Sequence, residues 1–347
     1  MKRVLIIGPS PNRIGGVSTH INRLSSLLND VYEFDYIDEG RKKQNGYFNL
    51  RSLNLWIYCD KFKKADIIHI HSAVFILRLF HVLMGRIVFR KHILVSIHHD
   101  LKVEGHIKTT RALLKLCNCA ILDSLEIYNS VYSKESACIY RIMPAFLPPV
   151  ENTEDELPSI IDSWIKDVKS NNNTVLMCSS SYSIDDYNGF DLYGNDMSIN
   201  AVRVLNNKKT GRIFYLLMIV HNSDKNSEKL IQYQNMIENG LRQNVMLVTK
   251  PISFLRVMKA SDVVLRPTNT DGDSITIREA LYFSKAIVAS DCAVRPEGTY
   301  VFKTRDLDDF CEKIIMSLDD NVNHNRPVVD YRKFYIECYE NGSSIRE

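Results

Sequence analysis

The sequence predicts an α/β protein built from two Rossmann-like domains. Short, continuous apolar runs alternate with helical patterns along most of the 347 residues, as expected for buried parallel strands joined by helices. This alternation stops once, at residues 143–158, where four prolines and a cluster of acidic residues indicate a linker. The length, with 45% hydrophobic and 24% charged residues, fits two globular domains with sizeable cores.

The first domain is expected to span residues 1–148 and the second residues 149–327. The first strand, at residues 3–8, is a continuous apolar run that ends in glycine and proline, and similar runs follow. The further strands predicted for the first domain lie at residues 67–70, 93–97, 120–122 and 138–142. Those predicted for the second domain lie at residues 174–178, 212–219, 245–248, 262–265 and 286–290, and a final helix is predicted at residues 328–339.

The most informative stretch is residues 266–281, which follows the fourth strand of the second domain. A proline ends that strand, and Ser274 is placed to cap a helix that runs to about residue 284. Asp271 lies in the loop, and Glu279 lies eight positions later on the helix. Two carboxylates therefore flank the free amides of a helix N-terminus, where amides suit a phosphate and carboxylates suit sugar hydroxyls.

The motifs Arg-Pro-Thr, Asp-Gly-Asp-Ser and Arg-Glu-Ala-Leu within this stretch resemble the acid-x7-acid signature of family 4 glycosyltransferases, in the version seen in bacterial surface polysaccharide (O-antigen, capsule or exopolysaccharide) assembly. These are retaining enzymes with the GT-B fold, in which two Rossmann-like domains with parallel sheets face a central cleft. The resemblance implies that Asp271, where the family more often has glutamate, is catalytic and contacts the donor sugar, and that Glu279 binds the nucleotide ribose. The residues implied to bind the donor beside Asp271 are Gly272, Asp273, Ser274 and Ile275.

The resembled fold also implies functions for the two domains. The second domain holds the donor, the first domain holds the acceptor, and a final helix, here about residues 328–347, crosses back to the first domain. Ligands of open α/β sheets bind at the carboxyl ends of the strands, so the cleft is expected there. Hinge motion at the linker is then expected to gate the chemistry.

Paired glycines, Gly15 and Gly16, follow the first strand at the start of a helix. They lack the spacing of the dinucleotide fingerprint, which disfavours a dehydrogenase. Glycines let backbone amides approach a ligand closely, and a helix N-terminus favours an anion. In the resembled family this loop faces the donor phosphates, so Gly15 and Gly16 are predicted to bind the donor.

Histidines end two strands of the first domain. The family has a functional histidine or aspartate near the second of these strand ends, so His99 and Asp100 are predicted to be catalytic and His98 to bind substrate. If Asp100 acted as a general base opposite the leaving group, inversion would result instead of retention. At the other strand end, His69 and His71 share one face, but no third ligand has a suitable spacing, so no metal site is predicted.

The second domain departs from the family at residues 177–191. Most members carry an arginine and a lysine there that clamp the diphosphate, whereas this stretch contains no cation. Neutralisation of the phosphate is therefore assigned to the hydroxyls of Ser180 and Ser181, or to Lys250 or Arg256 near a neighbouring strand end.

Charge is distributed unevenly, with 21 Lys or Arg against 12 Asp or Glu in residues 1–150 and an acidic remainder. In the basic half, residues 75–91 combine apolar bulk with cations. They predict either a helix resting on an anionic membrane surface or a core helix with a solvated basic edge. The segment around them is too short and too polar to cross a bilayer. Nucleic-acid binding is disfavoured because the basic residues are not interleaved with aromatic ones.

The eight cysteines are scattered, with no Cys-x-x-Cys pair, and no signal peptide is recognised at the first residues. These features predict reduced thiols and a cytoplasmic protein, which the basic half would hold at the inner face of the plasma membrane.

Together these features predict a retaining glycosyltransferase. It would move a sugar from a nucleotide-diphosphate sugar to a growing glycan, linked to a polyprenyl diphosphate, without a metal or other cofactor. Two alternatives stay open. One is another nucleotide-sugar enzyme on the same fold, such as a 2-epimerase, which needs acid/base residues that are not evident. The other is a non-catalytic scaffold that kept the fold and lost the clamp.

Overall fold

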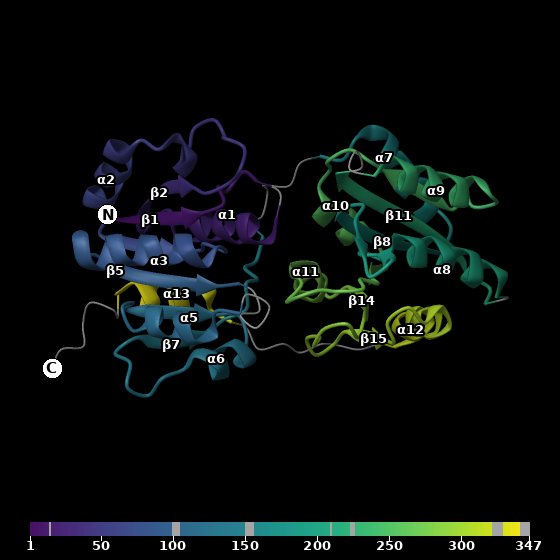
Figure 1. Ribbon diagram of the computed structural model, residues 1–347. Coiled ribbons are helices and arrows are strands. Elements are labelled where there is room, and N and C mark those ends of the chain that lie inside the picture. Colours follow the sequence, from purple (N-terminus) through teal and green to yellow (C-terminus); the bar gives the residue numbers. More distant parts are fainter. Residues whose placement is uncertain are drawn as a thin grey trace. The chain divides into compact units, whose positions relative to one another are not determined.

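The computed structural model describes residues 1–13, 15–98, 105–149, 156–208, 210–222, 226–320 and 329–340. The chain divides into two compact units, and each has its own parallel sheet. Unit 1 comprises residues 1–150 and 327–347, and unit 2 comprises residues 151–326 (Figure 1).

Seven strands form the parallel sheet of unit 1, in the order β3-β2-β1-β4-β5-β6-β7 among the described residues. Alternate residues of β1 enter different cores: Leu5 and Ile7 pack on one face, and Val4 and Ile6 on the other. Both faces are buried, which explains why the central strands are continuous apolar runs. The strands are β1 Lys2–Gly8, β2 Tyr32–Asp38, β3 Phe48–Asn49, β4 Ile67–Ile70, β5 His92–Ile97, β6 Cys119–Leu122 and β7 Ile139–Ile142.

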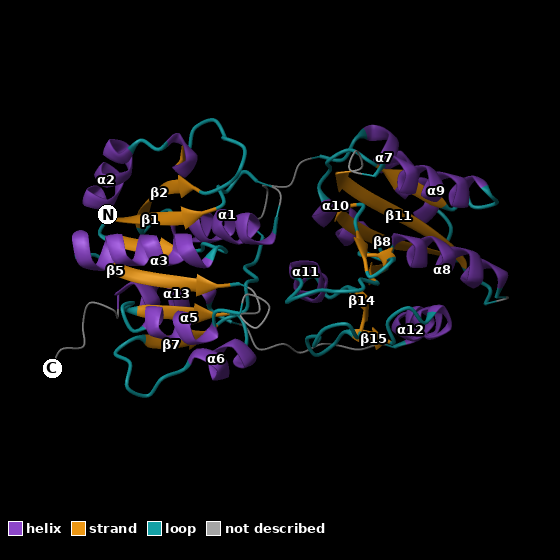
Figure 2. Cartoon of the chain, viewed as in Figure 1, coloured by secondary structure: helices purple, strands orange, loops and turns teal. Residues whose placement is uncertain are grey.

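Helices cover both faces of this sheet (Figure 2). The last helix, α13, belongs to unit 1, because its residues Tyr335, Cys338 and Tyr339 pack in the same core as Val4 and Ile6. The helices are α1 Gly16–Leu28, α2 Leu55–Lys64, α3 Phe75–Leu83, α5 Ile107–Leu114, α6 Leu125–Val131 and α13 Tyr331–Glu340, with a 3₁₀ turn at Leu50–Ser52 and a π-helical turn at Met84–Val88.

Unit 2 has a six-stranded parallel sheet in the order β12-β11-β8-β13-β14-β15, with a small antiparallel pair, β9 and β10, beside it. Its strands also separate two cores, as Met177 and Cys178 of β8 show by entering one each. The strands are β8 Thr174–Ser183, β9 Asp186–Tyr187, β10 Phe190–Asp191, β11 Ile213–Asn222, β12 Val245–Val248, β13 Val263–Arg266, β14 Ala286–Ser290 and β15 Tyr300–Phe302. The helices are α7 Ser159–Lys169, α8 Asn195–Asn207, α9 Ser227–Glu238, α10 Phe254–Ala260, α11 Ile275–Tyr282 and α12 Leu307–Asp319.

The predicted α/β class with two parallel sheets is confirmed, and the differences lie at the strand ends and sheet edges. The sequence did not predict β2, whose tyrosines and acids alternate with apolar residues, nor the short strands β3 and β15. It ended β8 and β11 too early. Both strands continue through polar residues because they pair with each other as far as Ser183 and Asn222.

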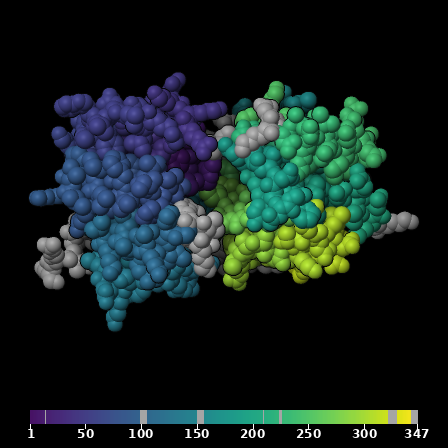
Figure 3. Space-filling model, in the orientation of Figure 1, coloured from purple at the N-terminus to yellow at the C-terminus, as the bar shows by residue number. Residues whose placement is uncertain are grey.

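Residues 75–91, predicted to lie on a membrane or to form a basic helix edge, become α3 and the π-helical turn. Arg78 points inward and donates hydrogen bonds to two carbonyl oxygens, and His81 is buried between Tyr58 and Glu39. The exposed residues of this segment include the apolar side chains of Ile76, Phe80, Ile87 and Val88 and the cations Arg86 and Arg90. Figure 3 shows the indigo and blue segments that carry α2 and α3 next to each other on the surface of unit 1. No described helix is long and apolar enough to span a bilayer.

Candidate functional site

The loop between β13 and α11 carries the acidic motif. Pro267 ends β13, and Ser274 stands at the N-cap of α11 with extended backbone. The Ser274 side chain makes no capping hydrogen bond, so the predicted side-chain cap is wrong, and α11 ends at Tyr282, earlier than predicted. The first amides of a helix have no partner within it, so the start of α11 offers N–H groups and a positive dipole end to an anion.

Asp271 is held by two arginines. Its Oδ2 accepts hydrogen bonds from Nε of Arg266 and from Nη1 of Arg295, each at 3.0 Å. Its Oδ1 accepts from Nη2 of Arg266 and from the amide of Gly272, each at 3.1 Å. The three side chains are 10%, 14% and 2% exposed for Asp271, Arg266 and Arg295, so this is a largely buried network.

Arg295 connects the Asp271 loop to the end of β14. Its Nε donates to the carbonyl oxygen of Ser290 at 2.8 Å, and its Nη2 lies 3.3 Å from the Thr268 hydroxyl. Ser290 in turn donates from its hydroxyl to the carbonyl oxygen of Thr268. The loop before α11 is therefore fixed to the neighbouring strand end by one guanidinium group and one hydroxyl.

The electrostatics of this network favour the charged forms of Asp271 and Arg266. Burial alone would raise the pKa of Asp271, but the charge and hydrogen bonds of Arg266, followed by those of Arg295, hold it below its usual value. Burial likewise opposes the charge of Arg266, and Asp271 outweighs it, so the pKa of Arg266 is raised. An additional contact from Asp271 to a sugar would have to be made beside, or replace, one of the hydrogen bonds that it accepts here.

The residues that lead into α8 also contact this loop. The amide of Asn269 donates to the carbonyl oxygen of Leu192 at 2.8 Å, and the guanidinium of Arg266 lies 5.4 Å from the centre of the Tyr193 ring. Gly194 has a φ of 66°, and a Cβ atom at this position would overlap the carbonyl oxygen of Pro267. Only glycine fits both the backbone conformation and this close approach.

The other predicted donor residues lie around the start of α11. Glu279 is 7% exposed and lies one turn after Ile275, on the same face of the helix. Gly272 is exposed, with open space where a Cβ would be. Asp273 accepts hydrogen bonds from Nε of Arg278 at 2.6 and 2.8 Å, so its charge is already paired.

Two of the residues predicted to neutralise the phosphate, Ser180 and Lys250, have no described contact with the loop between β13 and α11. The Ser180 hydroxyl lies 3.4 Å from Nε2 of His221, whose pKa is lowered by burial, and Lys250 is exposed after β12. The cations next to Asp271 are Arg266 and Arg295, which sequence reasoning missed. Arg266 lies within the motif itself, but Arg295 comes from the end of another strand, and no spacing rule connects it to Asp271.

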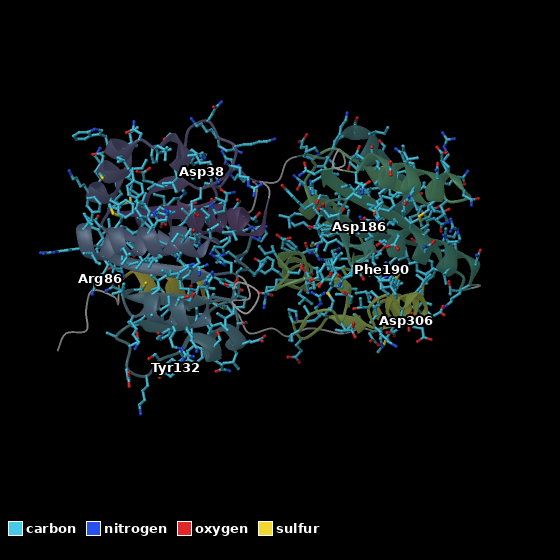
Figure 4. The ribbon with its side chains drawn as sticks, in the orientation of Figure 1. Asp38, Arg86, Tyr132, Asp186, Phe190 and Asp306 are labelled. Atoms are coloured by element: carbon cyan, nitrogen blue, oxygen red, sulfur yellow. The ribbon has the colours of Figure 1, made fainter. Side chains whose placement is uncertain are left out.

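A polar cavity of about 430 Å³ adjoins this region at the β9–β10 hairpin. It is lined by Asp186 and Phe190, labelled in Figure 4, and by residues of α9. Lys229 pairs with Asp186, and the guanidinium of Arg305 lies 4.9 Å from the centre of the Phe190 ring. Arg305 also pairs with Asp196 at 2.7 Å, so both cations of the lining are paired with acids of the lining. Sequence reasoning did not identify this cavity.

In unit 1, Gly15 and Gly16 begin α1 as predicted. Gly15 has a φ of 150° and open space around its Cα. The loop before it is fixed by Asp38 at the end of β2 (labelled in Figure 4), which is fully buried and accepts hydrogen bonds from Arg13 and from the amide of Ser10. Because this carboxylate is occupied by the protein, it is not the ribose-binding acid of a dinucleotide site, which agrees with the absent fingerprint.

Histidine side chains gather at the carboxyl ends of β4 and β5. His71 and His98 lie side by side, with Nδ1 of His71 2.8 Å from Nε2 of His98, and His20 of α1 lies against both rings. Of the three residues predicted at 98–100, His98 is placed here, whereas His99 and Asp100 lie outside the described residues. The sequence did not associate His20 with this group, because it lies on a helix about fifty residues before the nearest of the others.

Neither a protein-family model nor a curated protein matches the sequence. Solved structures resemble it in fold. HepE of Anabaena in complex with UDP has a TM-score of 0.66 at 14% identity, over 92% of this chain and 90% of that chain. A glycosyltransferase from Rickettsia africae has a TM-score of 0.64 at 12% identity, over 91% and 88%. Sucrose-phosphate synthase of Thermosynechococcus elongatus has a TM-score of 0.59 at 13% identity, over 92% and 90%. The chain therefore has the GT-B type of fold, with two α/β units and parallel sheets.

Proposed function

We propose that this protein is a retaining glycosyltransferase. It moves a sugar from a nucleoside-diphosphate sugar to a growing glycan on a polyprenyl diphosphate, in the synthesis of a bacterial surface polysaccharide. The family 4 signature at residues 271–279 supports the activity and its stereochemistry. The similarity of fold to HepE, solved with UDP and with UDP-glucose, supports a nucleotide-sugar donor.

The observation that carries the proposal is the network of Arg266, Asp271 and Arg295. It fixes the loop that leads into α11, and it places two guanidinium groups against one carboxylate, an excess of one positive charge. This excess takes the place of the arginine and lysine that residues 177–191 lack. A donor diphosphate at the α11 N-terminus would meet amides, a dipole and this charge together.

Glu279 is the proposed ribose ligand. A carboxylate accepts hydrogen bonds from both hydroxyls of a ribose, and Glu279 lies one turn inside the helix whose first amides face the phosphates. Its burial, at 7% exposure, fixes its direction and strengthens such hydrogen bonds.

The transfer breaks the bond between the anomeric carbon and a diphosphate oxygen, and it forms a bond to an acceptor oxygen that loses its proton. Negative charge develops on the leaving diphosphate, so hydrogen-bond donors aimed at it lower the barrier. The amides at the start of α11 are the proposed donors in unit 2, and Gly15 and Gly16 of unit 1 stay predicted donor-binding residues. His99 and Asp100 stay predicted catalytic residues.

A lipid-linked acceptor is supported by an apolar patch on unit 1, which we define as the exposed apolar side chains of residues 53–57 and of α3 with its π-helical turn. Trp56 is 88% exposed and Leu55 is 68% exposed. A groove of about 220 Å³ between α2 and α3 is lined almost entirely by apolar side chains. The exposed cations Arg86 and Arg90 lie on the same segment. Apolar side chains beside cations suit the surface of an anionic membrane, here the cytoplasmic face.

Calorimetry and a transfer assay test the proposal together. UDP, GDP and dTDP sugars are titrated into the protein, and the donor that binds is then incubated with a polyprenyl-diphosphate-linked glycan. We expect one class of donor to bind and the product to keep the anomeric configuration of the donor, as read by NMR.

The other outcomes separate the alternatives. If no nucleotide sugar binds, the proposal is wrong. Binding without transfer supports a scaffold, and a product changed at C2 of the sugar supports an epimerase. A product of opposite anomeric configuration contradicts retention alone.

A further inference from the structure

Three histidines from three different elements bring ring nitrogens together inside unit 1. His20 comes from α1, His71 follows β4, and His98 follows β5. Each offers one nitrogen, and the three nitrogens lie within 4.8 Å of one another. His20 and His71 are 1% and 2% exposed, and the side chain of His98 is 5% exposed.

The hydrogen-bond partners of these rings fix which nitrogens carry protons. Nδ1 of His20 lies 2.6 Å from the carbonyl oxygen of Ala145, which can only accept, so Nδ1 donates and the lone pair is on Nε2, 3.3 Å from the Tyr335 hydroxyl. Nδ1 of His98 lies 3.2 Å from a carboxylate oxygen of Asp123, so Nε2 of His98 also keeps its lone pair. That lone pair accepts from Nδ1 of His71, and the lone pair of His71 is then on Nε2.

Nε2 of His71 is buried and has no hydrogen-bond partner among the described residues. A buried acceptor without a partner is costly and calls for a ligand or a bound ion. Two of the three rings also show the arrangement of metal-binding histidines, in which the nitrogen away from the metal donates to a carboxylate or a carbonyl oxygen. The cluster therefore has a buried nitrogen without a described hydrogen-bond partner, and two of its rings have the supporting partners of a metal site.

We propose that His20, His71 and His98 bind one Zn²⁺ ion, with a water molecule or another oxygen ligand in the fourth position. Three neutral imidazoles and one open position are a common zinc set, with Zn–N distances of about 2.0–2.1 Å. Tetrahedral geometry at such distances places the nitrogens about 3.4 Å apart, so the rings must approach one another by roughly 1 Å. Nε2 of each ring supplies its lone pair to the ion, so the hydrogen bond from Nδ1 of His71 to Nε2 of His98 is lost when the ion binds.

His69, the immediate neighbour of His71 on the same face, provides a contrast. Its ring centre lies 4.0 Å from that of His71, and it is fully buried. Both of its nitrogens are already bonded, Nδ1 to the Tyr339 hydroxyl at 2.9 Å and Nε2 to the Ser96 hydroxyl at 2.8 Å. His69 is therefore a structural residue that ties β4 to β5 and α13, and it is a matched control for His71.

The zinc content of the untagged wild-type protein is the first test. Elemental mass spectrometry should find about one zinc ion per chain after growth with zinc, and the zinc-free protein should regain it. Cobalt in place of zinc should give the visible absorption of a four-coordinate ion. A protein that takes up no zinc in stoichiometric amount, or whose cobalt form shows only six-coordinate absorption, overturns the proposal without any variant.

Variants then assign the ligands. Competition with a chromophoric chelator should show zinc binding weakened by two or more orders of magnitude in His71→Ala, and by roughly 10- to 100-fold in Asp123→Asn, which removes the carboxylate behind His98. His69→Gln should leave the affinity unchanged. Unfolding curves recorded with EDTA check that each variant folds without zinc. If His71→Ala does not fold, the zinc affinity of Asp123→Asn is the result that tests the proposal. Zinc bound equally well by all three variants would be bound elsewhere and would contradict the proposal.

Discussion

The loop after β13 in unit 2 and the histidine cluster after β4 and β5 in unit 1 both lie at carboxyl ends of parallel strands, yet opposite chemistry builds them. In unit 2, Arg266, Asp271 and Arg295 are all charged, and each oxygen of the Asp271 carboxylate accepts at least two hydrogen bonds. In unit 1 the rings of His20 and His71 are neutral, and one buried nitrogen has no described partner. The first site has excess positive charge for an anion, and the second offers the nitrogen lone pairs of three imidazoles, one of them without a described partner, for a cation.

The difference shows how one kind of sheet edge is adapted to two kinds of ligand. Strand ends supply a fixed position, and the side chains that meet there set the sign of what binds. In unit 2 the acid pairs with two arginines, so the amides of the helix N-terminus and one net positive charge remain for a phosphate. In unit 1 the acid Asp123 contacts Nδ1 of His98, so the other nitrogen of that ring, Nε2, faces the cluster.

Removing the acid from the unit 2 network should have the largest effect on stability. Asp271→Ala leaves Arg266 and Arg295 close together and largely buried without a counter-charge. We expect the free energy of unfolding of unit 2 to fall by about 3 kcal/mol. The measurement is a urea titration followed by the fluorescence of Trp164, which packs on Tyr215 in unit 2, in a Trp56→Phe background where it is the sole tryptophan.

An exposed ion pair supplies the control for that experiment. Asp30 pairs with Arg332 on the surface of unit 1, where its side chain is 61% exposed. Asp30→Ala should leave the unfolding of unit 2 unchanged. A loss in Asp271→Ala no greater than in Asp30→Ala would show that the network is not a buried charge cluster, and the comparison of the two sites would lose its basis.

The contact between the start of α8 and the loop gives the next largest effect. Gly194→Ala puts a methyl group against the carbonyl oxygen of Pro267 at positive φ. We expect a loss of about 2 kcal/mol and weaker donor binding, because the loop must shift. Gly240→Ala has a φ of 86° but open space around it, so it should cost only about 1 kcal/mol and leave binding intact. Equal losses of stability in Gly194→Ala and Gly240→Ala would mean that the positive φ alone, and not the contact with Pro267, determines the cost.

Two exposed surfaces of unit 1 can be compared through membrane binding. Trp56→Ser should weaken binding to vesicles that contain phosphatidylglycerol by roughly tenfold, since it removes the most exposed aromatic side chain of the apolar patch. Tyr132→Ser, at an exposed aromatic residue elsewhere on unit 1, should not. Co-sedimentation measures both. Binding of wild type that is equally strong to uncharged phosphatidylcholine vesicles would contradict the contribution of the cations.

Acid should weaken unit 2 through Asp271 by a smaller amount. The pKa of Asp271 is lowered in the folded state, whereas an aspartate in the unfolded chain titrates near 3.9. Above that pH both states are ionised and the stabilisation is complete. As the pH falls toward the folded pKa, the unfolded state binds the proton first, so stability is lost, by at most about 1.4 kcal/mol per pH unit for this one group. The Trp164 signal of wild type should show this slope between about pH 4 and 3, and Asp271→Asn should show a shallower one.

The sequence was sufficient to predict most of the fold. Parallel strands such as β4, β12 and β14 consist mostly of apolar residues, and the predicted ranges for these three agree with the structure residue by residue. Strand β2 escaped prediction because acidic residues alternate with its apolar ones, and β15 because it has only three residues at the sheet edge.

The candidate sites were less predictable. Spacing along the chain located Asp271 and Glu279, since a loop and the following helix keep their distance in sequence. Arg295 and His20 could not be found in this way, because each meets its site through the order of strands and helices in the sheet. Asp271 also shows that a motif position does not give a side chain's partners, which here are two arginines.

The central claim is that a nucleotide sugar binds at the start of α11, with Glu279 on its ribose. The most direct measurement is the dissociation constant of the donor for wild type, for Glu279→Gln and for Glu312→Gln, an equal change at an exposed position of α12 in the same unit. We predict that Glu279→Gln weakens binding at least roughly tenfold, because a charged hydrogen-bond acceptor is lost, while the variant still unfolds in a cooperative transition and Glu312→Gln binds as wild type. Equal dissociation constants for all three proteins would contradict the account.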